Sequence, residues 1–182
     1  MSVHFKVPLA MTQWILPILT YCAMMPDQKK TYTFFGSKFV HRHSDGGLHE
    51  FTPKDQPNLD NWTEMLTVNR YATIKAGEDL AKVANNVLGA YQDHGGKVLK
   101  TSSIPRTEKR TAEHLIVVSF DRNKFSEVAF SRFLIDGGIG CSLVFSHRSY
   151  GGKSRAEVAA WIAKNGAKIE KELMAVKVMP KP

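Results

Sequence analysis

The alternation of apolar and polar residues predicts a strand-rich domain interrupted by two helices. From residue 30 onward, short runs of β-branched and aromatic residues are separated by turns that contain glycine or proline, which is typical of strands. The run 114–120 is almost continuously apolar, as expected for a central strand covered on both faces. Strands are expected over about 31–35, 38–43, 48–52, 62–71, 97–102, 114–120, 125–135 and 139–147.

Two longer segments have the three- and four-residue apolar spacing of amphipathic helices. The first helix is expected over 75–94, ended by Gly95-Gly96, and the second over 154–176. Ser154 and Glu157 have the spacing of a capping box for the second helix. The expected buried stripes are Leu80, Val83, Ala84, Val87, Leu88 and Tyr91 in the first helix, and Val158, Trp161, Ile162, Ile169, Leu173 and Val176 in the second.

The element order predicts an α+β fold with a mostly antiparallel sheet packed by two main helices. Asp45-Gly46-Gly47 and Asp136-Gly137-Gly138 lie between strand-like runs, and such turns join antiparallel neighbours. We expect a single domain over 25–176 and a loose tail over 177–182.

The first 24 residues predict export. A single charge, Lys6, is followed by an apolar stretch and a polar continuation, which is the layout of a signal peptide cleaved near Ala23. Gln13 and Pro17 interrupt the apolar run, so no stable transmembrane span is expected in the mature chain. Lipid attachment at Cys22 and a retained apolar segment are the alternatives. We therefore expect a periplasmic or secreted protein.

Charge and cysteine content narrow the possible partners. The net charge of +8 favours anionic partners, but Lys and Arg are spread along the chain, so nucleic acid is not expected. The densest basic cluster is Arg106, Lys109 and Arg110, interrupted by Glu108. Two cysteines exclude a disulfide scaffold and a Cys-rich zinc site.

Three histidines flank the first glycine turn and suggest a metal site. A three-residue loop at Asp45–Gly47 brings His41, His43 and His49 to one face, where they form a set for zinc or copper. A two-residue loop at Asp45-Gly46 moves His49 to the opposite face. Solvated histidines are the simpler interpretation, and no cofactor is expected.

Two further groups are candidates for binding or chemistry. His147, Arg148 and Tyr150 precede the second helix, where such a loop is suited to bind an anion. Trp62 is a candidate for stacking on a ligand, although core packing is the ordinary role of such a residue. Cys141 lies in an apolar alternation and is expected to be a buried structural residue rather than a nucleophile.

No hydrolase elbow, phosphate loop or dinucleotide fingerprint is present, so the sequence does not indicate an enzyme. The run from Leu59 to Val68 resembles small bacterial secreted proteins of unknown function and, more distantly, the PsbP-like or DcrB-like α/β sandwich group. That resemblance implies a binding or accessory role. We therefore expect a non-enzymatic exported binding or accessory protein, with a metal-binding module at the hairpin histidines and a basic module for polyanions as alternatives.

Overall fold

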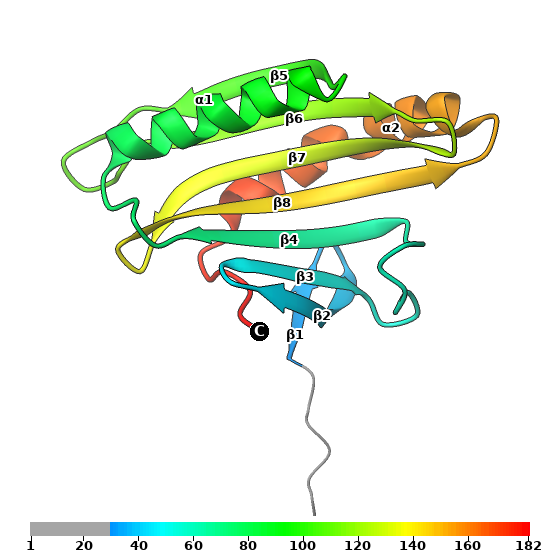
Figure 1. Cartoon of the computed structure of the whole chain (residues 1–182). Helices are drawn as coiled ribbons and strands as arrows, with labels where there is room; N and C mark the ends of the chain where they lie inside the picture. Colours follow the sequence, from blue (N-terminus) through cyan, green and yellow to red (C-terminus); the bar gives the residue numbers. More distant parts are fainter. Residues whose placement is uncertain (1–29) are drawn as a thin grey trace, which may run out of the picture.

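A computed structural model describes residues 30–182 as one eight-stranded antiparallel sheet and two helices (Figure 1). The predicted signal peptide and Cys22 lie outside these residues. Along the chain the elements are β1 (Thr31–Phe34), β2 (Ser37–Asp45), β3 (Leu48–Pro53), β4 (Glu64–Tyr71), α1 (Gly77–Asp93), β5 (Lys97–Ile104), β6 (Glu113–Asp121), β7 (Phe125–Asp136), β8 (Ile139–Tyr150) and α2 (Ser154–Ala175). The predicted α+β fold and all eight expected strands are confirmed.

The sheet has two halves that meet at β4 and β8. The strand order is β1-β2-β3-β4-β8-β7-β6-β5, and every neighbouring pair is antiparallel. Consecutive strands pair within each half, and α1 carries the chain from β4 to the far edge at β5. None of the helices within residues 30–182 has the length and apolar character needed to span a bilayer.

The helices cover opposite faces of the sheet, as Figure 1 shows. The α2 face holds the main core, in which Phe130, Leu143 and Phe145 meet Ile169 and Leu173 of the helix. A smaller hydrophobic cluster lies between α1 and the opposite face of the sheet. It contains strand residues whose side chains point away from α2, such as Ile116 and Phe133. Successive side chains of a strand point to opposite faces, and successive residues of β6 and β7 are buried and apolar. Both faces of these two strands are therefore apolar.

Arg132 joins β7 to the end of α2. As the alternation predicts, its side chain lies on the same face as Phe130, and it is only 5% exposed. Nη1 donates to the carbonyl oxygens of Leu173 at 2.9 Å and Val176 at 2.8 Å, and Nη2 lies 2.8 Å from Oε2 of Glu113. The guanidinium thereby donates to two carbonyl groups at the end of α2, where the last carbonyl groups of a helix lack the usual donor four residues ahead.

Three local expectations are corrected by the structure. Residues 177–182 form no helix or strand, but Met179 is 2% exposed within the main core, so this tail is anchored. Ser154 does not cap α2: Lys153 is the N-cap residue, and the Ser154 hydroxyl lies 3.1 Å from that of Ser126. The strand expected over 62–71 begins at Glu64, so Trp62 precedes it.

Candidate functional site

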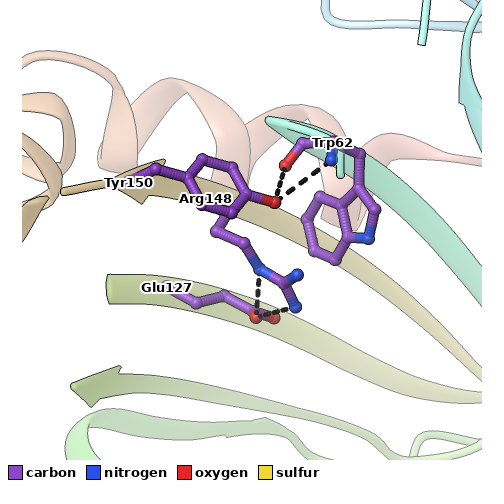
Figure 2. Close-up of polar contacts among 4 residues, drawn as sticks. All are labelled: Trp62, Glu127, Arg148 and Tyr150. Atoms are coloured by element: carbon purple, nitrogen blue, oxygen red, sulfur yellow. Dashed lines mark hydrogen bonds and ion pairs between the residues drawn. The ribbon is translucent and has the colours of Figure 1, made fainter. Parts of the chain in front are cut away.

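Three of the predicted binding residues meet at one end of the sheet (Figure 2). Tyr150 Oη accepts a hydrogen bond from the Trp62 backbone N–H at 3.1 Å and donates to the Trp62 carbonyl oxygen at 2.9 Å. Arg148 Nε and Nη2 lie 3.1 and 2.8 Å from the same oxygen of Glu127. Trp62, Glu127, Arg148 and Tyr150, together with Phe125, are called the arginine clamp below.

The guanidinium of Arg148 is enclosed on both of its flat sides. Its Cζ atom lies 3.9 Å from the ring centroid of Trp62 and 3.8 Å from that of Phe125. The side chains of Arg148 and Glu127 are each only 15% exposed. A charge that is already paired and stacked has little capacity left for an external anion. The arginine clamp therefore fastens the loop before β4 to the ends of β7 and β8.

His147, the fourth predicted binding residue, points to the other face of the sheet. Its ring stacks on Trp161 of α2 with a centroid distance of 4.1 Å and an interplanar angle of 7°. Nδ1 is buried without a hydrogen-bond partner. Burial lowers the pKa of His147 from 6.5 to about 4. His147 is therefore a half-buried, neutral side chain near pH 7 that packs on α2 and is separated from Arg148 by the sheet.

We expect His147 to make folding pH-dependent between about pH 6.5 and 4. In this range the unfolded chain binds a proton at His147 that the folded chain does not, so stability falls as the pH falls. The difference between 6.5 and about 4 sets an upper bound of about 3 kcal/mol, and the contact of the ring with solvent makes the expected loss smaller. Urea unfolding at pH 7 and pH 4.5 should show a smaller loss for His147→Phe than for the wild type. The exposed control His43→Phe should keep the wild-type loss, and an unchanged loss in His147→Phe would refute the assignment.

The hairpin histidines do not converge into a metal site. Asp45 pairs with Leu48, so the loop is Gly46-Gly47, and both registers considered from the sequence are wrong. Glycine is required at position 47 because a Cβ there would collide with the carbonyl oxygen of Arg70 on β4. His43 pairs with Glu50 and therefore lies on the face opposite His49, which pairs with Ser44.

A bulge at Arg42 returns His41 to the face of His49. The Ser44 hydroxyl lies 2.8 Å from Nε2 of His41 and 2.8 Å from Nδ1 of His49. One hydroxyl has one proton to donate, so the two rings play different hydrogen-bonding roles. Within residues 30–182 no group of three or more His, Cys, Asp or Glu residues could hold a metal ion. Through these two hydrogen bonds, Ser44 links His41 on β2 to His49 on β3 near the end of the hairpin.

Cys141 has the surroundings of a structural residue. Its side chain is completely buried, and Arg70 Nη1 lies 3.8 Å from Sγ and 3.3 Å from Oδ2 of Asp136. Burial raises the pKa of the Cys141 thiol above its usual value. Because the thiolate is the reactive form, this environment opposes nucleophilic chemistry.

A further opening lies between the start of α1 and the loop that joins β5 to β6. It has a volume of about 770 Å³, within the range of small-molecule sites. One wall comes from the beginning of α1 and the other from the loop and the start of β6. The lining residues, which define the α1 cavity, are Ala76, Gly77, Glu78, Ala81, Arg106, Thr107, Glu108, Lys109, Arg110, Thr111, Ala112 and His114.

The basic loop makes a tight turn and passes close to the start of α1. Thr107 and Arg110 form an isolated antiparallel bridge, in which the Thr107 N–H donates to the Arg110 carbonyl oxygen at 2.9 Å. The loop then passes the helix start, where a Cβ on Gly77 would lie 3.9 Å from the backbone nitrogen of Ala112. No side chain caps α1 at its N-cap residue Ala76. The basic loop thus lies beside the start of α1, where no side chain caps the helix.

His114 supplies a polar group beside this basic loop. Nδ1 lies 2.8 Å from the hydroxyl of Ser103, whereas Nε2 is buried without a hydrogen-bond partner. Burial lowers the pKa of His114 below 6.5, so the ring is neutral near pH 7. A buried nitrogen without a partner carries a free-energy cost, which a bound ligand can remove.

The sequence indicated only one of the two walls of the α1 cavity. Arg106, Lys109 and Arg110 stand out as the densest basic cluster, but a charged loop usually faces solvent. The other wall begins about 30 residues earlier and reaches the loop only because α1 crosses from β4 to the sheet edge. A periodic pattern places α1 on the sheet but does not place its first turn against a particular loop.

Comparison with known proteins leaves the function open. No protein-family model matches the chain, and no match is found among curated proteins. A crystal structure of PA94 from Pseudomonas aeruginosa, a protein of unknown function, is 12% identical over 85% of this chain and 98% of that one, with a TM-score of 0.45. Human STARD10 is 9% identical over 74% of this chain and 71% of that one, with a TM-score of 0.31.

Proposed function

We propose that this chain is a non-enzymatic binding protein whose small ligand occupies the α1 cavity. The observation that carries the proposal is a cavity of about 770 Å³ lined by both small apolar residues and polar groups. Ligand sites typically combine apolar lining with a few polar groups that orient the ligand. The arginine clamp, in contrast, has its polar groups occupied by one another.

The proposal includes export to the periplasm or outside the cell, and an accessory role like that of the PsbP-like or DcrB-like group. Its basis is the sequence: the signal-like layout of residues 1–24 and the resemblance of the Leu59–Val68 run. We expect N-terminal sequencing of the protein recovered from expressing cells to find a chain that begins near Ala23. Recovery of the protein in the cytoplasm with Met1 or Ser2 at its N-terminus would contradict export.

A cavity-filling substitution tests the binding proposal. Ala81 lines the α1 cavity on the helix side, so an indole at this position is expected to occupy ligand space. We expect saturable fluorescence enhancement of 1-anilinonaphthalene-8-sulfonate with the wild type and an affinity loss of about tenfold or more with Ala81→Trp.

The matched control is Ala90→Trp, at an exposed position of the same helix outside the cavity lining. Urea unfolding of both variants establishes that each is folded. Unchanged dye binding in a folded Ala81→Trp variant, or an equal loss in both variants, would contradict binding in the α1 cavity.

A further inference from the structure

The three basic residues of the α1 cavity differ in their surroundings from the buried arginines. Arg132 and Arg148 each have a carboxylate partner at 2.8 Å. For Arg106, Lys109 and Arg110, no ion pair is found anywhere in residues 30–182. Three cations of one short loop thus line a cavity with their charges available to a ligand.

His114 gives the same cavity a potential neutral donor. When the Ser103 hydroxyl donates to Nδ1, the ring carries its proton on Nε2, the atom that is buried without a partner. Because Nε2 has almost no contact with solvent, a ligand oxygen accepts from this N–H group only when the ring turns toward the cavity. This observation is independent of the basic residues, since His114 belongs to β6 and they belong to the preceding loop.

Two carboxylates limit how much negative charge a ligand can bring. Glu78 and Glu108 also line the cavity, so the lining has three cations and two carboxylates, a formal sum of +1. Glu78 lies in the first turn of α1, where the helix dipole favours a negative charge. A lining of this balance suits one anionic group and disfavours a polyanion such as nucleic acid, which needs a continuous basic surface.

Apart from the hydroxyl groups of Thr107 and Thr111, the rest of the lining suits a short apolar portion of a ligand. Ala76, Gly77, Ala81 and Ala112 carry no polar side-chain atoms. They come from both walls, the first three from the helix start and Ala112 from the end of the loop. Apolar ligand atoms placed between them would lose contact with water, which is favourable in proportion to the area buried.

We infer that the ligand is a small molecule with one carboxylate or phosphate group attached to a short apolar portion. Arg106, Lys109 and Arg110 hold the anionic group, His114 donates to it, and the alanines contact the apolar portion. This inference rests on the proposed binding function and specifies its ligand class.

Calorimetric titrations of the full chain with hexanoate, hexyl phosphate and the uncharged hexanamide test the ligand class. We expect at least one of the two anions to bind about tenfold or more tightly than hexanamide, because hydrogen bonds to charged groups are the stronger ones. Arg106→Gln/Arg110→Gln should remove that preference. The control Lys164→Gln/Lys168→Gln, which also removes two positive charges but from exposed positions on α2, should retain it.

The outcomes separate this inference from the function on which it rests. Equal binding of all three compounds, blocked by Ala81→Trp, would overturn the anionic class and leave a ligand cavity. Absence of saturable binding for all three and for the fluorescent dye would overturn both. Binding to phosphatidylglycerol vesicles without saturable binding of hexanoate or hexyl phosphate would overturn the small-molecule ligand in favour of a membrane surface.

Discussion

Arg132→Met is expected to lower the free energy of unfolding by about 3–5 kcal/mol, the usual cost of breaking a buried ion pair by removing one partner. The side chains of Arg132 and Glu113 are only 6% and 12% exposed. Removing the guanidinium leaves the Glu113 carboxylate without its cation and removes a donor from the carbonyl groups of Leu173 and Val176, of which Leu173 keeps only the long bond from the Val176 N–H at 3.4 Å. The measurement is urea denaturation followed by circular dichroism.

Two further variants show whether the ion pair is the cause. Arg132→Met/Glu113→Leu should recover part of the lost stability, because the unpaired carboxylate is gone while the carbonyl groups still lack their donor. Arg155→Met removes an arginine that is 82% exposed and paired with Asp121, and should cost no more than about 1 kcal/mol. An effect of Arg132→Met as small as that of Arg155→Met would refute the anchoring of α2 through this side chain.

Arg148→Met is expected to cost about 2–4 kcal/mol, because it breaks the ion pair with Glu127 and removes the cation from between Trp62 and Phe125. This result decides whether the arginine clamp stabilises the fold or binds a ligand. Thermal unfolding should show the loss, whereas binding of hexanoate and hexyl phosphate to the folded variant at low temperature should remain as in the wild type.

Arg148→Lys separates charge from geometry at the same position. Lysine retains the positive charge but lacks the planar fork that donates two hydrogen bonds and stacks between two rings. We expect Arg148→Lys to be destabilised relative to the wild type and to bind ligand normally. Full stability of Arg148→Lys together with lost anion binding would instead make Arg148 a ligand-binding residue, as its position shortly before the second helix first suggested; the structure places it within β8 rather than in a loop.

The fold follows from the sequence because its signals are local. Eight runs of strand-forming residues and two amphipathic stripes correspond to the observed elements within a few residues. The side of β7 on which Arg132 lies also follows from simple alternation. Gly95, with a φ of 74°, provides the left-handed residue after α1 that the Gly95-Gly96 pair predicted.

The hairpin register does not follow from the same reasoning. A single extra residue at Arg42 changes the face of every side chain on one side of it, and the alternation of polar residues in this strand does not mark the bulge. The choice of Gly46-Gly47 for the loop depends on β4, because the Arg70 carbonyl leaves no room for a side chain at position 47. That contact joins strands distant in sequence, so the sequence did not show which of the three histidines share a face.

The candidate site depends even more on long-range placement. Trp62, Phe125 and Arg148 come from three segments, and only their meeting shows that the cation is already enclosed. The α1 cavity is formed by two segments that the crossover helix brings together. The residue types alone pointed to the basic loop and to the predicted binding residues. Only the folded structure shows which of their charged side chains lack an ion-pair partner and can contact a ligand.

Amide chemical shifts recorded during a titration with hexanoate test the central claim most directly, because they report where on the chain the ligand lies. We predict saturable shifts at the two walls of the α1 cavity, at residues 76–81 and 106–114, with Trp62, Phe125 and Arg148 unchanged. Shifts concentrated at Trp62, Phe125 and Arg148, with none at the start of α1, would contradict the account.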